Sequence, residues 1–272
     1  MSADPTQVLA FETDCHLFDG CGFPAPGLHS FLFEPLWGDA EGVYFNKPML
    51  LALLGSIIVV GFFWAAFSKP KLVPGKLQMV AEAGYDFVRE GIVYQTIGRR
   101  EGEKYVPLAV ALFFFIWMMN LWSIIPVAQF PVTSIIAYPM VLAAIVYILW
   151  VSLTFKRHGF VGALKNFTGY DKSLGPVLPL AMTIEFFSNL LVRPFTHAVR
   201  LFANMFAGHT LLLLFTIASW YMLNGIGIAY SAVSFLMVIV MTAFELFIQA
   251  VQAYVFVLLT CTFIQGALAE HH

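Results

Sequence analysis

The sequence has 272 residues, of which 60% are hydrophobic and only 11% are charged. A water-soluble domain of this length needs more polar residues to cover its surface, so the composition excludes that class and indicates that a bilayer is the solvent for most of the chain. The formal net charge is -2 and no basic run is present, which argues against a nucleic-acid partner.

The first 46 residues form a polar segment that we expect to lie outside the cell. It carries Asp4, Glu12 and Asp14 and lacks the basic and apolar regions of a signal peptide, so membrane insertion is expected to rely on the first span. Cys15 and Cys21 are compatible either with a disulfide or with two free thiols. No cysteine has metal-ligand spacing, and we expect no metal and no cofactor.

Apolar runs predict the elements of the first part of the chain. Residues 48–67 are uncharged and long enough for one crossing. Residues 77–97 mix apolar and charged positions, which predicts an amphipathic helix on the cytoplasmic membrane surface. Two further spans are predicted at about 106–127 and 134–155, followed by a polar connection over 159–173.

The distribution of basic residues predicts the orientation. Lys and Arg gather in the loops at 69–104 and 156–172, whereas the loops at 128–133 and 224–230 contain none. The positive-inside rule places the basic loops in the cytoplasm. The N-terminus is then outside and the C-terminus is cytoplasmic.

Residues 174–222 are mostly apolar and twice as long as one perpendicular crossing requires. Two spans broken near Arg193 and Pro194 would place Arg193 and Arg200 outside, against the charge pattern. One long tilted helix, kinked at Pro194, is the favoured alternative. The last span, 231–267, is also too long, which indicates two helices tilted together.

The predicted fold class is therefore all-α: a polytopic membrane protein with about five transmembrane helices and a cytoplasmic-surface amphipathic helix, ending in a hairpin of two long tilted helices. The predicted organisation is an outside segment over 1–46, three spans with the surface helix over 47–173, and a proton-path hairpin over 174–272.

The last two predicted helices carry polar side chains inside the bilayer, where an Arg costs roughly 2.5–3.5 kcal/mol and usually has a function. These are Glu185, Asn189, Arg193, His197, Arg200, Asn204, His209, Glu245, Gln249 and Gln252. Spacings of three and four predict that the five from Asn189 to Asn204 share one helical face. The three from Glu245 to Gln252 share another face by the same spacing, and His209 projects roughly opposite to the first.

Folding the hairpin back about residues 226–227 places polar residues at equal depths. The matched pairs are Arg200 with Gln252, Asn204 with Gln249, and His209 with Glu245. His209 and Glu245 lie nearer the outer end, and these residue types can relay protons near neutral pH. Arg200 lies deeper as a fixed cation, Gln252 can hydrogen-bond it without neutralising it, and Glu185 could serve a cytoplasmic exit.

Purely structural interpretations remain open at these positions. Arg200 could be a buried cation that fixes helix packing, and His209 with Glu245 could be a plain inter-helix hydrogen bond. A packing role is favoured for His197, and Asn189 and Gln249 are more often contacts between membrane helices than parts of a pathway.

Two stretches carry a resemblance to a known family. Residues 193–209, RPFTHAVRLFANMFAGH, and residues 249–256, QAVQAYVF, resemble subunit a of the F-type ATP synthase membrane sector. The resemblance covers about residues 40–268 and implies a stator in a bacterial plasma membrane. It would conduct protons through two half-channels to and from a rotating subunit c ring, contacted through residues 185–265, with peripheral-stalk subunit b as a further partner.

By this resemblance, Arg200 is the essential arginine that faces the ring carboxylate. Asn204, His209, Glu245 and Gln252 match family positions linked to the proton pathway, and some members carry Glu and His exchanged at the positions of His209 and Glu245. Glu185 matches an acidic family position only approximately, because its spacing to Arg193 differs by about one residue. The chain lacks a GxxxxGK[ST] loop, so we expect no bound nucleotide and no enzymatic activity of its own.

Three rival functions are less favoured. A secondary ion transporter or antiporter usually shows internal repeats, and none is evident between the halves. An intramembrane enzyme would need a motif such as HExxH or GxSxG, and neither is present. A haem site formed by His197 and His209 is disfavoured because twelve residues place them about 120° apart around a helix.

Overall fold

The computed structural model describes residues 46–71, 73–125, 128–168, 178–223 and 227–268, together with Phe23 and Pro26. Every regular element in these residues is helical, which confirms the predicted all-α class. Five helical stretches are long and apolar enough to cross a membrane, as predicted: Lys47–Phe67, Arg99–Leu121, Ala137–Thr168, Leu178–Tyr221 and Ile228–Leu268. Cys15, Cys21 and most of the N-terminal segment lie outside the described residues.

The first span, α1 (Lys47–Phe67), leans on α5 (Val106–Leu121), which lies near the centre of the molecule. Most of α1 is exposed, as expected of a helix surrounded by lipid. At Gly55 the two helices approach closely, because a methyl group there would overlap the side chain of Met119 on α5.

The surface helix consists of α2 (Lys76–Val88), the π-turn η3 (Arg89–Val93) and α3 (Tyr94–Thr96). Together they confirm the amphipathic helix predicted over 77–97. The buried face packs on α5 through the cluster that contains Val88, Ile92 and Val93. The outer face exposes apolar side chains that a bilayer surface would cover: Leu77, Met79, Val80 and Phe87.

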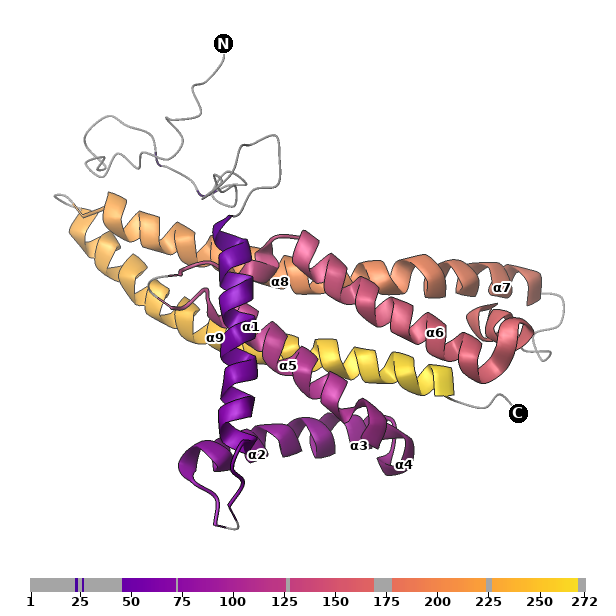
Figure 1. Ribbon diagram of the computed structural model, residues 1–272. Helices are drawn as coiled ribbons and strands as arrows, with labels where there is room; N and C mark the ends of the chain where they lie inside the picture. Colours follow the sequence, from indigo (N-terminus) through magenta and orange to yellow (C-terminus); the bar gives the residue numbers. More distant parts are fainter. Residues whose placement is uncertain are drawn as a thin grey trace.

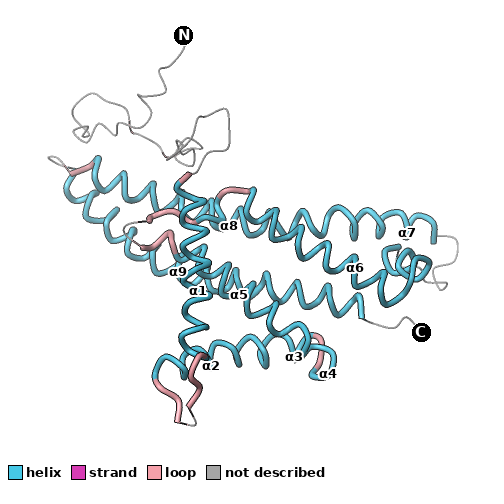
Figure 2. Tube along the Cα trace, in the orientation of Figure 1, coloured by secondary structure: helices cyan, strands magenta, loops and turns pink. Residues whose placement is uncertain are grey.

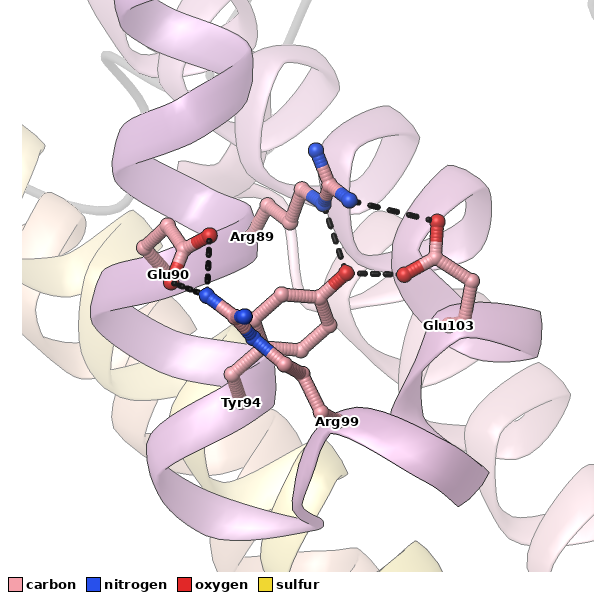
Figure 3. Close-up of polar contacts among 5 residues, drawn as sticks. All are labelled: Arg89, Glu90, Tyr94, Arg99 and Glu103. Atoms are coloured by element: carbon pink, nitrogen blue, oxygen red, sulfur yellow. Dashed lines mark hydrogen bonds and ion pairs between the residues drawn. The ribbon is translucent and has the colours of Figure 1, made fainter.

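A polar network ties the surface helix to the base of the second span (Figure 3). The Arg89 Nε donates to the Tyr94 hydroxyl at 2.7 Å, and this hydroxyl donates to the Glu103 carboxylate. The Arg99 guanidinium lies 5.4 Å from the Tyr94 ring centre and 3.4 Å from the Glu90 carboxylate. The hydrogen bond to Glu103 raises the pKa of the Tyr94 hydroxyl above its usual value. The network fixes the orientation of the surface helix rather than adding much stability, because its groups are exposed.

This network spans a tight turn that leads into the second span. Gly98 has φ 91°, a left-handed conformation that favours glycine. Two short elements follow it, α4 (Arg99–Gly102) and the 3₁₀ turn η4 (Glu103–Tyr105), before α5 begins. Gly98 thus reverses the chain so that Glu103 returns beside Tyr94.

The third span, α6 (Ala137–Thr168), turns sharply at Gly159, where φ is 65°. The prediction of a polar connection beginning at residue 159 is therefore wrong for its first part, because residues 160–168 are helical. Their apolar positions explain the helix: Ala163 and Phe167 are buried against Trp150 and Ala267. Hydrophobic burial stabilises this helix although Lys165 and Asn166 lie between its apolar positions.

The returning half of α6 holds the end of the last helix, α9 (Ile228–Leu268). The Asn166 amide donates to the carbonyl oxygen of Gly266 at 3.2 Å, and the His158 Nε2 lies 3.0 Å from the carbonyl oxygen of Ala267. The last carbonyls of a helix have no donor within the helix, so these side chains cap the end of α9.

Residues 178–221 form one continuous helix made of α7 (Leu178–Phe187), the π-turn η7 (Ser188–Val192) and α8 (Arg193–Tyr221). This agrees with the single long helix preferred over two spans. The kink expected at Pro194 takes the form of the π-turn just before it, and Pro194 occupies the first turn of α8, where a missing N–H is tolerated.

The long helix and α9 form the predicted hairpin (Figures 1 and 2). Near its apex the Ser231 hydroxyl donates to the Ser219 carbonyl at 2.6 Å, joining the two helices. Figure 1 shows that the hairpin and α6 run steeply across the direction of α1, whereas α2 lies at the C-terminal end of α1. The two overlong helices are therefore accommodated by tilt.

Candidate functional site

Helix α8 divides its polar residues between two faces. His197, Leu201, Met205 and His209, spaced four residues apart, are buried, whereas Arg200 is exposed. The prediction that all the polar residues from 189 to 204 share one face is therefore wrong. The prediction that His209 projects away from Arg200 is confirmed.

The His197 ring is drawn to the buried face by aromatic packing. Its centre lies 3.9 Å from that of Phe256 and 5.6 Å from that of Phe263, both on α9. Three helical residues separate two side chains by about 60° around the axis. This rotation is enough to bury His197 while Arg200 faces outward.

The exposed face carries three charged residues in one line, Glu185, Arg193 and Arg200. Arg200 follows Arg193 by seven residues, which is two helical turns. Glu185 precedes Arg193 by eight residues, but the π-turn η7 inserts one extra residue between them. The eight residues from Glu185 to Arg193 then turn the chain about the helix axis by as much as seven α-helical residues would. Glu185 therefore lies on the same face of the helix as both arginines.

Arg200 makes no hydrogen bond and no ion pair with any residue in the described part of the chain. Thr196 and Asn204, one turn to either side of it, are also exposed, and neither carries a negative charge. A guanidinium on a membrane-facing helix surface is costly unless an acid or water reaches it. Within the described residues Arg200 is thus an exposed cation with no acidic partner.

A part-buried hydrogen bond between the two hairpin helices joins Asn204 to Gln252. The Asn204 Nδ2 donates to the Gln252 Oε1 at 2.6 Å. The predicted depth match paired Gln252 with Arg200, one turn away. The predicted alignment of the two helices is thus correct to within one turn. Because Arg200 faces outward, Gln252 bonds to Asn204 instead.

Gln249 is fully buried and has a partner that sequence reasoning missed. Its amide Nε2 donates to the Ser123 hydroxyl at 2.6 Å, not to Asn204 as the depth match predicted. Ser123 follows α5, where Asn120 is hydrogen-bonded to Thr133. The only sequence signal for this contact is the pair of polar residues, Asn120 and Ser123, near the end of an apolar span.

Glu245 and His209 are both 3% exposed and approach the same region of the hairpin. The Glu245 Cγ lies 3.9 Å from the Cβ position of Gly208, the residue next to His209. Neither Glu245 carboxylate oxygen has a hydrogen-bond partner among the described residues, and the hydrogen-bonded pair Gln249 and Ser123 supplies the nearby polar side chains. A buried carboxyl group, a nearby imidazole and two polar neighbours form a set of groups that can exchange protons.

Within the described ranges, no group of three or more His, Cys, Asp or Glu residues could hold a metal ion. The polar residues described above include one acid in each half of the hairpin, together with amides and hydroxyls. This set does not resemble the cage of ligands that binds a metal ion.

The fold and site define a polytopic membrane protein with a long terminal hairpin. The exposed face of this hairpin carries a cation without an ion pair in the described part of the chain, and its interior holds a buried polar cluster. Residues 49–265 match the profile of the family described as ATP synthase A chain, and the chain belongs to this family. It is 84% identical to ATP synthase subunit a of Streptomyces lividans, over 100% of this chain and 97% of that protein. It is 40% identical to the same subunit of Nocardioides sp. strain JS614, over 93% and 96%, and 41% identical to that of Pseudarthrobacter chlorophenolicus, over 93% and 97%.

Proposed function

We propose that this chain is the stator subunit that passes protons through two half-channels to and from the carboxylates of a rotating subunit c ring. It belongs to the ATP synthase A chain family. The observation that carries the finer assignment is Arg200, which is exposed and has no ion pair with any described residue. A cation on a membrane-facing helix surface is explained if an acidic group of a neighbouring subunit meets it there.

The outer half-channel is proposed to lead through the buried cluster. Glu245, His209 and Ser123 lie among packed helices away from the exposed face, so protons entering there are shielded from Arg200 until they approach the ring. The Asn204–Gln252 pair spans the gap between this cluster and the exposed face.

The cytoplasmic half-channel is proposed to follow the exposed line of charges towards Glu185. When a ring carboxylate comes opposite Arg200, the fixed cation favours its ionised form and so drives release of its proton. Glu185, two turns beyond Arg193, is placed to accept protons on that side. The same cation repels a proton that would pass directly between the two half-channels.

The orientation and the remaining partners follow from charge distribution and from the family. Basic loops next to the surface helix place it in the cytoplasm, with the N-terminus outside and the C-terminus cytoplasmic in a bacterial plasma membrane. Peripheral-stalk subunit b would hold the chain still while the ring turns. A potential of 100 mV supplies about 2.3 kcal/mol per charge moved, so many protons are needed for each ATP made elsewhere in the complex.

Mild-detergent purification tests this function against that of a secondary ion transporter. We expect the tagged chain to purify with a ring of small two-helix subunits and to conduct protons in liposomes only when the ring is present. Native mass spectrometry would identify the ring. A chain that purifies alone and exchanges ions without any ring would instead support the transporter.

A further inference from the structure

A small cavity lies behind α8, on the side that packs against α6 and α9. Its volume is about 10 Å³, and its apolar wall includes Val146, Trp150 and Phe263. Asn189, Arg193 and His197 bring polar groups to the same space. This volume is at the lower limit needed for one water molecule.

Two buried polar atoms of residues that line this cavity have no partner among the residues that the structure describes. The Nε2 of His197 and the Oδ1 of Asn189 form no hydrogen bond, and their residues are 4% and 3% exposed. The amide of Asn189 is held in place because its Nδ2 donates to the Phe167 carbonyl at 2.9 Å. The His197 ring is likewise fixed by stacking on Phe256. Leaving such atoms unpaired in a membrane protein is costly.

The backbone of the π-turn contributes a third unpaired group. The Arg193 N–H donates to the Ser188 carbonyl, five residues back. Pro194, the next residue, has no N–H, so a carbonyl at Asn189 or Leu190 loses its backbone donor. Pro194 lines the cavity, which places this break in the helix beside the two unpaired side-chain atoms.

We propose that the cavity binds one ordered water molecule, which forms the missing hydrogen bond of each of these three groups. The water donates its two hydrogens to the Asn189 Oδ1 and to the freed carbonyl, which are both acceptors. Its oxygen then accepts from His197, which fixes the Nε2–H tautomer of the ring. Arg193 also lines the cavity, and its positive charge disfavours a metal cation as the occupant.

This water has a structural task distinct from proton transfer at Arg200. Helix breaks within a membrane persist only where side chains or water satisfy the freed backbone groups. The water would stabilise η7 and Pro194, and η7 brings Glu185 into register with Arg193 and Arg200. The site therefore helps to hold Glu185, Arg193 and Arg200 in register.

A density map of the assembled complex that resolves buried waters elsewhere in this subunit tests the site. We expect a peak within about 2.7–3.2 Å of the His197 Nε2 and the Asn189 Oδ1. An empty cavity would overturn the proposal. So would a guanidinium of Arg193 folded into the cavity and bonded directly to both atoms.

Filling the cavity provides a second, independent test. Val146→Ile adds a methylene group at the cavity wall, and Val141→Ile adds the same group at an exposed position of α6. Displacing a bonded water should lower the dissociation temperature of the subunit by about 2–4 °C, with no change in the Val141→Ile control. Filling a dry cavity would raise that temperature instead, and such a rise would contradict the bound water.

Discussion

Arg200→Ala is expected to abolish proton-driven ATP synthesis while the complex still assembles. Arg200 has no partner in the described part of the chain, so its removal breaks no internal bond. Two unit charges 4 Å apart interact by about 4 kcal/mol at an effective dielectric constant of 20. Losing that interaction raises the proton affinity of the facing carboxylate by almost three orders of magnitude. Protons would then stay on the ring, and coupling would fail.

Synthesis and passive proton flow should be measured in the same vesicles. We expect Arg200→Ala to lose synthesis by at least about a hundredfold without blocking passive flow, because the barrier between the half-channels is also lost. Arg200→Lys keeps the charge but loses the planar guanidinium, so it should give an intermediate rate. Near-normal coupled synthesis in Arg200→Ala would remove the mechanism.

His209 and Glu245 are expected to act as a coupled pair in proton entry. Both are buried, and Glu245 packs against the residue next to His209. His209→Ala and Glu245→Ala should each lower the proton flux by about tenfold or more, as expected for loss of a positioned proton carrier. The double variant should be little worse than either single variant, because residues that act as a unit are strongly non-additive.

The exchange of the two residues provides the matched control. His209→Glu combined with Glu245→His keeps one acid and one imidazole, and should recover much of the flux. Proton flux driven by a potassium diffusion potential measures all four variants. Purely additive losses, with no recovery in the exchanged protein, would show that the residues act separately.

The spans and the hairpin could be predicted from the sequence because they depend on hydropathy and charge averaged over long segments. Apolar runs fix where helices cross, and the position of basic residues favoured one long helix through Arg193 and Pro194 over two spans. The depth of the hairpin contacts was also predicted to within one turn, since α8 up to Tyr221 and α9 from Ile228 are both continuous helices.

The contacts of individual side chains could not be predicted in the same way. The π-turn at 188–192 changes the register by one residue, and no spacing rule shows where an extra residue is inserted. Ser123 reaches Gln249 from a distant segment, so it has no periodic relation to the hairpin. The helix after Gly159 forms because Ala163 and Phe167 find a buried surface that only the folded chain provides.

The central claim is that the exposed face of α8, which carries Arg200, meets the ring. Disulfide cross-linking tests it directly, with single cysteines paired against one placed next to the ring carboxylate. Ala207 is exposed two turns beyond Arg200, whereas Met205 is buried. The account predicts that Ala207→Cys cross-links to the ring and Met205→Cys does not; cross-linking at Met205→Cys without any at Ala207→Cys would contradict it.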